Sequence, residues 1–423
     1  MFDSRDSRRF QLLVVSLGLL LAGAGCGREV PQAPAEREKS EQALAARNVV
    51  LLIGDGMGVD HVRAASLYAH GRDDALVMQQ MPHGGLVRTH SANGHDTPTD
   101  SAAAGTAMAT GRKVFNNTVS MDNPGTKEPL ETVLERAKAG GMRTGLVTTS
   151  VITHATPAAF AAHVHHRNDY SAISNRMLNE VQPDLLFGAT LKTDSILGVT
   201  PEKARKAGYR VVTDRKQMQQ LSSLSESKVS GQFHSGSHMP YMHDYQTKQT
   251  TVYDEAPTLS EMTVKALELL SKSDKGFFLM VEGARIDHAG HQNDLQRGIG
   301  ETLEFDRAVE TVLTWAAGRT DTLVIVVSDH ETGGLRVSDQ GAAKGKIPPH
   351  SWSTTGHTSV FVPIWATGVG AGAVRDVIDN TEVYRLMIGE PINPRKLEEI
   401  PENLIPKMPE PKKKPQAAEA YPG

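Results

Sequence analysis

Cysteine is almost absent from this chain, because Cys26 is the only one among 423 residues. No disulfide can form within the chain, so its stability must come from a packed core and from bound metals. A strong charge imbalance is also absent, since the formal net charge is −4. That balance gives no indication of binding to nucleic acid or to an acidic membrane surface. An internal repeat is not evident either.

A hydrophobic run long enough to span a bilayer is also missing near the N-terminus. The apolar stretch 12–24 follows three arginines and has the length of a signal-peptide core instead. Cys26 comes directly after it, as in a bacterial lipoprotein whose first residue is lipidated. Gly23 stands where the usual lipoprotein signal has leucine, so cleavage near Ala24 by ordinary signal peptidase is the alternative. We expect a periplasmic or cell-envelope protein that is attached to the membrane through Cys26.

The composition divides the chain into four parts. Residues 1–26 form the targeting segment, and the charged, Pro/Ala-rich residues 27–46 are expected to form a tether. A globular domain follows at 47–394, which is ordinary for a large α/β fold with insertions. Residues 395–423 are basic and proline-rich, so we expect a disordered tail there.

Three apolar segments of the domain end abruptly in residues that can bind metals. Each has the composition of a strand buried on both faces, and parallel strands deliver such residues at one edge of a sheet. Asp287 and His291 are four residues apart, so one helical turn or a tight loop can direct both at one cation, and this pair suits zinc. For any one segment, a solvated polar loop after a core strand is the alternative. The segments and their polar residues are 48–53 with Asp55, 277–281 with Glu282, Asp287, His288 and His291, and 322–327 with Asp329 and His330.

The first of these segments has a competing interpretation as a dinucleotide-binding fingerprint. Gly54 and Gly56 follow the strand, and Asp73 and Asp74 lie about twenty positions further on. The third small residue of that fingerprint would fall at Val59. A dinucleotide-binding fingerprint also leaves the polar residues at the other two strand ends unexplained, so this interpretation is much weaker than that of a metal site.

A candidate nucleophile lies between the first two segments. Residues 101–110 are alanine-rich and predict a helix, with Asp100 as its N-cap and Gly111 as its stop. Ser101 then lies in the first turn, where free N–H groups and the helix dipole favour an alkoxide or a phosphoryl oxygen. The alternative is that Asp100 and Ser101 only cap the helix.

A further segment contributes a loop and a cation. Residues 144–149 predict a strand that leads into a loop with His154 and Thr156. A short helix is expected to begin at Pro157, because proline is favoured at the first helical position, and the segment ends in Arg167. An arginine binds two phosphoryl oxygens at once and keeps its charge.

Taken together, these segments resemble the alkaline phosphatase family. They occur in the family's order and cover most of the chain from Asn48 to Ile364. We expect a three-layer α/β/α sandwich with a large, mostly parallel sheet, and hydrolysis of small phosphate monoesters through a phosphoserine at Ser101. The matching segments are NVVLLIGDGMG (48–58), TDSAAAGTAMATG (99–111), THATPAAFAAHVHHR (153–167), VEGARIDHAGH (281–291), VSDHETGG (327–334) and TTGHTS (354–359).

The resemblance implies two Zn²⁺ ions and one Mg²⁺ ion, with Arg167 as the phosphate clamp. Two cations about 4 Å apart can stabilise the attacking and leaving oxygens of an in-line displacement. All-oxygen ligands suit magnesium, whereas sets with histidine suit zinc. A lone histidine is more often a structural residue than a metal ligand. His357 is a candidate because the other segments leave one zinc site a ligand short. The implied ligands are Asp287, His291 and His357 for one zinc, Asp55, Asp329 and His330 with Ser101 as the reacting ligand for the second, and Asp55, Thr156 and Glu282 for magnesium.

Two positions depart from the best-known bacterial members of the family. His154 stands where they carry aspartate and His288 where they carry lysine, whereas the animal enzymes have histidine at both. We expect weaker product binding and an altered magnesium shell. Three histidines within 231–245 are interpreted as surface residues of an insertion near the substrate mouth.

Two other functions remain as alternatives. One is a phosphodiesterase or sulfatase of the same superfamily, although Arg167 and the complete magnesium set favour monoesters and no Cys/Ser-x-Pro-x-Arg motif marks a sulfatase. The other is a phosphate- or metal-binding lipoprotein without catalysis, which would not need Ser101. The resemblance also suggests a homodimer.

Overall fold

The computed structural model describes most of the predicted domain. Its residues belong to one compact unit. Within this part of the chain, no helix combines the length and the apolar composition needed to cross a membrane. The targeting segment with Cys26, most of the tether and most of the C-terminal tail lie outside the described residues. Those residues are 43–190, 198–224, 228–236 and 238–400.

The packed domain extends a few residues beyond both predicted limits, 47 and 394. Leu44 and Ala46, assigned to the tether from the sequence, are buried in the core. Arg395, assigned to the tail, exchanges two backbone hydrogen bonds with Val377.

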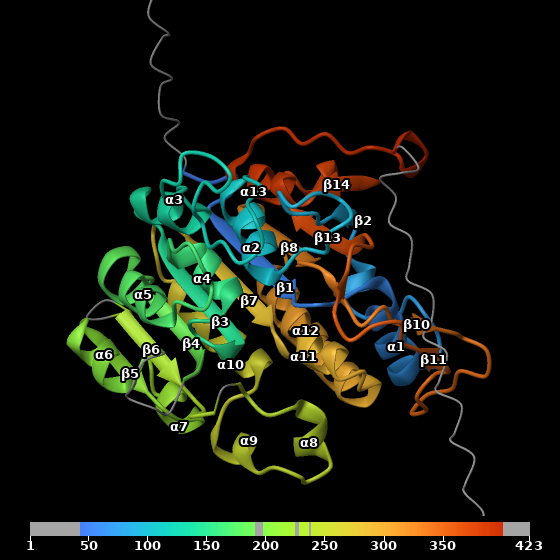
Figure 1. Cartoon of the computed structure of the whole chain (residues 1–423). Helices are drawn as coiled ribbons and strands as arrows, with labels where there is room; N and C mark the ends of the chain where they lie inside the picture. The colour runs from blue at the N-terminus through green and yellow to red at the C-terminus, as the bar shows by residue number, and fades with distance from the viewer. Residues whose placement is uncertain (1–42, 191–197, 225–227, 237, 401–423) are drawn as a thin grey trace, which may run out of the picture. The chain divides into compact units, whose positions relative to one another are not determined.

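A ten-stranded sheet forms the centre of the domain (Figure 1). Its order is β14-β2-β13-β8-β1-β7-β3-β4-β6-β5, and within it β13 alone runs against the other strands. The strands are β1 (Asn48–Gly54), β2 (His83–Arg88), β3 (Arg143–Val151), β4 (Leu185–Ala189), β5 (Tyr209–Val212), β6 (Lys228–Gln232), β7 (Phe277–Gly283), β8 (Thr322–Ser328), β13 (Val362–Gly368) and β14 (Val377–Asp379).

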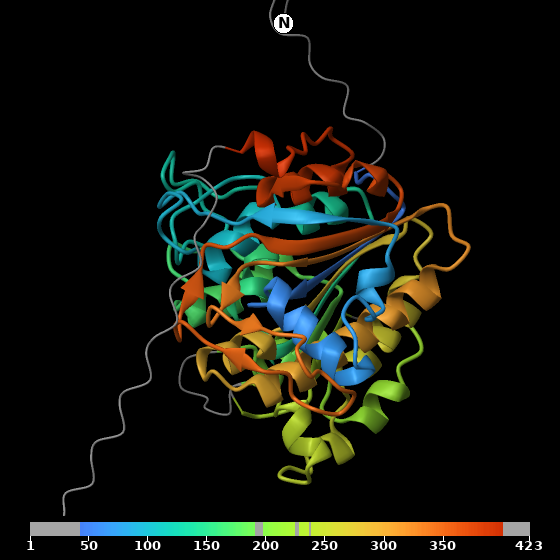
Figure 2. The same ribbon diagram turned by 90° about the vertical axis from the view of Figure 1, so that its right-hand side faces the viewer.

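Helices cover both faces of the sheet, because successive side chains of a strand point to opposite sides. In β1, Val49, Leu51 and Ile53 belong to one hydrophobic cluster, and Val50 and Leu52 belong to another. Figure 2 shows the strands between the two helical layers. The predicted three-layer α/β/α sandwich is therefore confirmed. The first cluster includes residues of α2 (Ser101–Thr110), α3 (Val133–Ala139), α4 (Ala155–Ala161), α5 (Tyr170–Asn175), α6 (Pro201–Lys206) and α13 (Asn380–Ile388), and the second those of α1 (Val59–His70), α7 (Arg215–Gln219), α8 (Met242–Gln246), α9 (Val252–Glu255), α10 (Leu259–Leu270), α11 (Arg285–His291) and α12 (Leu295–Ala316).

Short elements complete the fold around the sheet. Two small antiparallel pairs lie on the segment between β8 and β13, and single helical turns lie elsewhere. The pairs are β9 (Glu331–Thr332) with β12 (His357–Thr358) and β10 (Arg336–Val337) with β11 (His350–Ser351). The turns are η1 (Met78–Gln80), η2 (Arg176–Val181), η3 (Ala371–Ala373) and η4 (Leu397–Glu399).

The first residues of helices α2 and α4 determine where nearby polar residues lie. Helix α2 begins and ends as expected, since Asp100 accepts a hydrogen bond from the N–H of Ala103 at 3.0 Å and Gly111 adopts a left-handed φ of 71°. Helix α4 begins at Ala155 and not at Pro157, so Thr156 lies in its first turn and not in a loop.

Candidate active site

The four strands that precede the predicted metal ligands are neighbours at the centre of the sheet, in the order β8-β1-β7-β3. Their register aligns their ends, because Gly54 of β1 lies opposite both Gly283 of β7 and Ser328 of β8. All four run parallel, so their carboxyl ends meet at one edge, where ligands bind in such sheets. The chain thus brings together residues that are up to 300 positions apart.

One group joins Asp287 and His291 of α11 with His357 of β12. The Nε2 atoms of His291 and His357 lie 3.3 Å and 3.4 Å from Oδ1 of Asp287. Each ring donates its Nδ1–H to a backbone carbonyl, of Thr355 at 2.6 Å and of Thr99 at 2.8 Å respectively. In the neutral ring this fixes a free lone pair on Nε2, which is the tautomer that binds a metal.

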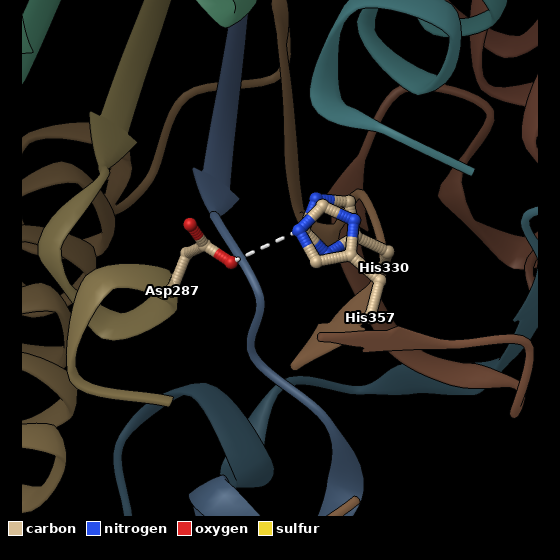
Figure 3. A group of neighbouring side chains, drawn as sticks. All are labelled: Asp287, His330 and His357. Carbon is tan, nitrogen blue, oxygen red and sulfur yellow. Dashed lines mark ion pairs between the residues drawn. The ribbon is translucent and has the colours of Figure 1, made fainter. Parts of the chain in front are cut away.

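A second group forms around His330, which is fully buried after β8. Its Nε2 lies 3.4 Å from Oδ1 of Asp55, 3.2 Å from Oδ2 of Asp329 and 3.2 Å from Oγ of Ser101. Its ring stacks on that of His357, with centroids 3.6 Å apart, so the two groups adjoin (Figure 3). Figure 3 also shows the carboxylate of Asp287 facing these imidazoles. Ser101 is the first residue of α2, as predicted.

A third group combines Asp55 and Glu282 with His154, the N-cap of α4. Oε2 of Glu282 accepts a hydrogen bond from Thr148 at 2.5 Å, while Oε1 lies 3.9 Å from Nδ1 of His154. Thr156 follows His154 by two residues and is fully buried, and its hydroxyl has no hydrogen-bond partner in the described structure.

The buried carboxylates of these groups require compensating positive charge. Among the described residues, both carboxylate oxygens of Asp55, Oδ2 of Asp329 and Oε1 of Glu282 are buried without a hydrogen-bond partner. Burial, together with the charges of Asp329 and Asp287, raises the pKa of Asp55 well above its usual value. Burial likewise raises the pKa of Asp329 to about 7. Buried carboxylates cannot all stay ionised side by side unless positive charge compensates them, so their oxygens fit divalent metal ions.

The histidine group has the opposite electrostatics. Burial alone would raise the pKa of Asp287, but hydrogen bonds from His291 and His357 hold it well below its usual value. The hydrogen bond to Asp287 raises the pKa of His291 to about 9. The Nε2 atoms of both imidazoles face Oδ1 of Asp287, so a cation bound there would replace the protons that these pKa shifts favour.

Arg167 is fixed beside Ser101 by a residue that the sequence identified only as a helix cap. Oδ2 of Asp100 accepts from Nη1 of Arg167 at 2.9 Å, while Oδ1 caps α2. Nη2 of Arg167 contacts Nε2 of His154 at 3.3 Å. Asp100 therefore connects the nucleophile's helix with the guanidinium, a role that no local sequence pattern indicates.

His288 does not join the metal-ligand groups but lies in a cluster of imidazoles with His154 and His238. The rings of His238 and His288 are 4.1 Å apart, and burial lowers the pKa of both, to about 3 and about 2. The interpretation of His238 as a surface residue was wrong, because the ring is half-buried and its Nδ1 pairs with Ser150 at 2.9 Å. The sequence also missed Thr332, whose hydroxyl donates to Asp287 at 2.5 Å.

A nucleophile at a helix N-terminus, a fixed guanidinium and adjoining carboxylate–imidazole groups define the class of metal-dependent phosphohydrolases. The family model of alkaline phosphatase matches residues 46–200 and 199–348. The chain therefore belongs to the alkaline phosphatase family, which is metal-dependent, and is a phosphoric monoester hydrolase.

Relatives and solved structures agree with this assignment. The chain is 35% identical to alkaline phosphatase 4 of Bacillus subtilis in an alignment of length 365 that covers 82% of this chain and 75% of that protein. It is 35% identical to the streptomycin-6-phosphate phosphatase of Streptomyces griseus in an alignment of length 419 that covers 84% of this chain and 92% of that one. The alkaline phosphatase of the Antarctic bacterium TAB5 superposes with a TM-score of 0.68 at 29% identity, covering 81% of this chain and 97% of the other.

Proposed function

We propose that this enzyme hydrolyses phosphate monoesters by double displacement through a phosphoserine at Ser101, with two Zn²⁺ ions and one Mg²⁺ ion bound. The observation that carries the proposal is the position of Ser101. Its Oγ lies 3.2 Å from Nε2 of His330, at the N-terminus of α2 and beside carboxylate oxygens that accept no hydrogen bond from the described residues. A residue that only capped the helix would not need that setting.

The donor sets fit these ions. The Nε2 lone pairs of His291 and His357 suit zinc, as does the combination of His330 with two carboxylates. The unpartnered oxygens of Asp55, Thr156 and Glu282 suit magnesium. When bound, the ions would lower the pKa of the nucleophile and neutralise the leaving oxygen.

The chain's own residues perform the remaining steps. Oγ of Ser101, as the alkoxide, attacks phosphorus in line with the departing alcohol, so the P–Oγ bond forms as the bond to the alcohol oxygen breaks. Water then attacks phosphorus from the side that the alcohol left, which breaks the P–Oγ bond and releases phosphate. Arg167, held by Asp100, binds non-bridging oxygens throughout, and the free N–H groups of α2 share that charge. Two inversions give retention at phosphorus.

Parallel rate measurements on a phosphate monoester, a phosphate diester and a sulfate ester test the function. We expect kcat/KM for the monoester to exceed the other two, because the guanidinium and the metal groups match a dianionic phosphoryl group. A faster reaction with the diester or the sulfate would favour the superfamily alternatives, and no hydrolysis of any ester would favour a binding protein.

A prediction about the third group follows from His154. Replacing His154 with aspartate would add a carboxylate beside Asp55 and Glu282, so we expect Mg²⁺ to bind more tightly, by at least about tenfold. Structures of TAB5 alkaline phosphatase variants in which a histidine is replaced by aspartate or glutamate contain magnesium in a site named M3. Titration of the zinc-loaded protein with Mg²⁺ measures the effect. His154→Asn, which adds no charge, is the control, and equal affinity in both variants would contradict the prediction.

The cellular setting is also a proposal. We infer a periplasmic or cell-envelope enzyme that is attached to the membrane through lipidated Cys26, acts on small phosphate monoesters and forms a homodimer. In cells, the wild type is expected in the membrane fraction and Cys26→Ala in the soluble extracytoplasmic fraction. Equal partition of both proteins would favour ordinary signal-peptidase cleavage. Sedimentation of the purified enzyme would show whether it dimerises.

A further inference from the structure

Arg285, the first residue of α11, is a cation without an acidic partner beside the phosphoryl site. No carboxylate among the described residues lies within ion-pair distance of it, and its Nε is buried without a hydrogen-bond partner. The two other arginines near this edge are compensated, Arg167 by Asp100 at 2.9 Å and Arg297 by Asp244 at 2.9 Å. The charge of Arg285 acts on the buried Glu301 only through space, so a guanidinium without a direct ion pair favours an anion that contacts it.

A row of imidazoles connects this arginine with the phosphate clamp. Nη1 of Arg285 donates to Nδ1 of His288 at 3.0 Å. The ring of His288 lies 4.1 Å from that of His238 and 5.9 Å from that of His154, which contacts Arg167. His288 and His154 therefore connect Arg285 with Arg167 through a continuous series of contacts.

The hydrogen-bond directions leave donors available at the Arg285 end. An arginine only donates, so Nδ1 of His288 must accept and the proton of its neutral ring is on Nε2. Cζ of Arg285 lies over the ring of Tyr241, 3.8 Å from its centroid, and no described residue accepts a hydrogen bond from the buried Nε–H. These N–H groups match the oxygens of a carboxylate or a phosphate.

Neighbouring contacts hold this arrangement in place. Tyr241 is also contacted by Arg297, at 4.7 Å from its ring centroid, and Arg297 makes two hydrogen bonds to Asp244 of α8. The backbone N–H of Met242 donates to the buried Glu301 of α12 at 2.6 Å, so α8 is attached to the body of the domain (Figure 1). The guanidinium is thus preorganised, which reduces the entropy lost when an anion binds.

We propose that Arg285 and His288, with His238 beside them, form a second anion subsite that takes a carboxylate or phosphate on the leaving-group part of the substrate. The proposal rests on the proposed phosphomonoesterase function and narrows its substrate class. The substrates would be phosphate esters whose leaving group carries a second anionic group.

Three substrates with the same three-carbon skeleton test this with the metal-loaded enzyme. Glycerol 1-phosphate has no second anion, 3-phosphoglycerate adds a carboxylate, and propane-1,3-diol bisphosphate adds a phosphate. Arg285→Met should lower the ratio of kcat/KM for the anionic substrates over glycerol 1-phosphate by about 10- to 100-fold, as expected when a charge-assisted hydrogen bond is lost. Arg285→Lys keeps the charge and should retain part of that ratio. The anionic substrate that loses more shows which anion the subsite takes.

The control is Arg297→Met, which also removes a guanidinium from Tyr241 but one that Asp244 already compensates. Its substrate ratio should stay near the wild-type value. An equal loss for all three substrates in Arg285→Met, or an equal change of the ratio in Arg297→Met, would overturn the subsite and leave the proposed function standing. If the wild type fails to hydrolyse glycerol 1-phosphate, the proposed function itself is overturned.

Discussion

Ser101→Ala is expected to lower the turnover of a phosphate monoester by on the order of 10⁴-fold, because it removes the only group proposed to form the covalent intermediate. The methyl group cannot attack phosphorus, whereas the clamp of Asp100 and Arg167 and all carboxylates and imidazoles of the site remain. Zinc content by elemental analysis should therefore stay close to that of the wild type.

Trapping measures the intermediate itself. Acid quenching of the wild type during turnover of a ³²P-labelled monoester should leave label on the peptide that contains Ser101, and the alanine variant should carry none. Ser66→Ala is a matched control, because Ser66 is also buried and hydrogen-bonded, to the carbonyl of Arg72 at 2.9 Å, but lies in α1 away from the site. It should cost about 1 kcal/mol of stability and leave the label intact. Near-normal turnover by Ser101→Ala would contradict double displacement.

The central strands were predictable because their sequences allow one interpretation. The runs at 48–53, 277–281 and 322–327 are apolar except for Asn48 and Thr322 at their first positions, which is typical of strands buried on both faces, and the structure extends each by one or two residues. The sheet order was not predictable, since β1 pairs with strands more than 200 residues away. The reversed direction of β13 depends equally on distant pairing.

Local errors have local physical causes. In helix α10, Val264 is apolar but 52% exposed. Leu259, Met262, Ala266 and Leu270 follow the spacing of three and four residues that forms the buried stripe, and Val264 lies off it. Hydrophobicity alone would therefore misplace Val264. Helix α4 was expected to start at Pro157 because proline is favoured at the first helical position. Proline is tolerated throughout the first turn, and Pro157 is the third residue of α4.

The sequence was sufficient to predict which residues of the site could bind metals, but not which residues contact one another. Asp55, Glu282 and Asp329 stand at strand ends, where residue type and position together indicate a site. His238 reaches the cluster because the N–H of Met239 bonds to the carbonyl of Thr149 in β3, a contact across 90 residues. The pairing of Asp100 with Arg167 spans 67 residues, so only the fold reveals it.

Exhaustive chelation is expected to remove activity and to lower thermal stability together. No disulfide constrains the chain, and the loss of tightly bound ions removes several kcal/mol of linked free energy, so the melting temperature should fall by on the order of 10 °C. Zinc should restore activity and magnesium should raise it further. Calorimetry and rate measurements on the same samples, with metal content determined by elemental analysis, follow both effects.

The fall in melting temperature on metal removal should depend on pH, and the buried carboxylates determine the direction of this dependence. Burial raises the folded-state pKa of Asp329 from 3.8 to about 7, and that of Asp55 rises as well. Without metal, an acid whose pKa is raised by folding destabilises the folded state progressively as pH increases from about 4 to about 7. In the metal-loaded protein the cations compensate these charges, so the difference in melting temperature between the two forms should be larger at pH 8 than at pH 5. A difference that is equal at both values would mean that the carboxylates do not meet at a cation, and full activity after verified metal removal would refute the metal assignment altogether.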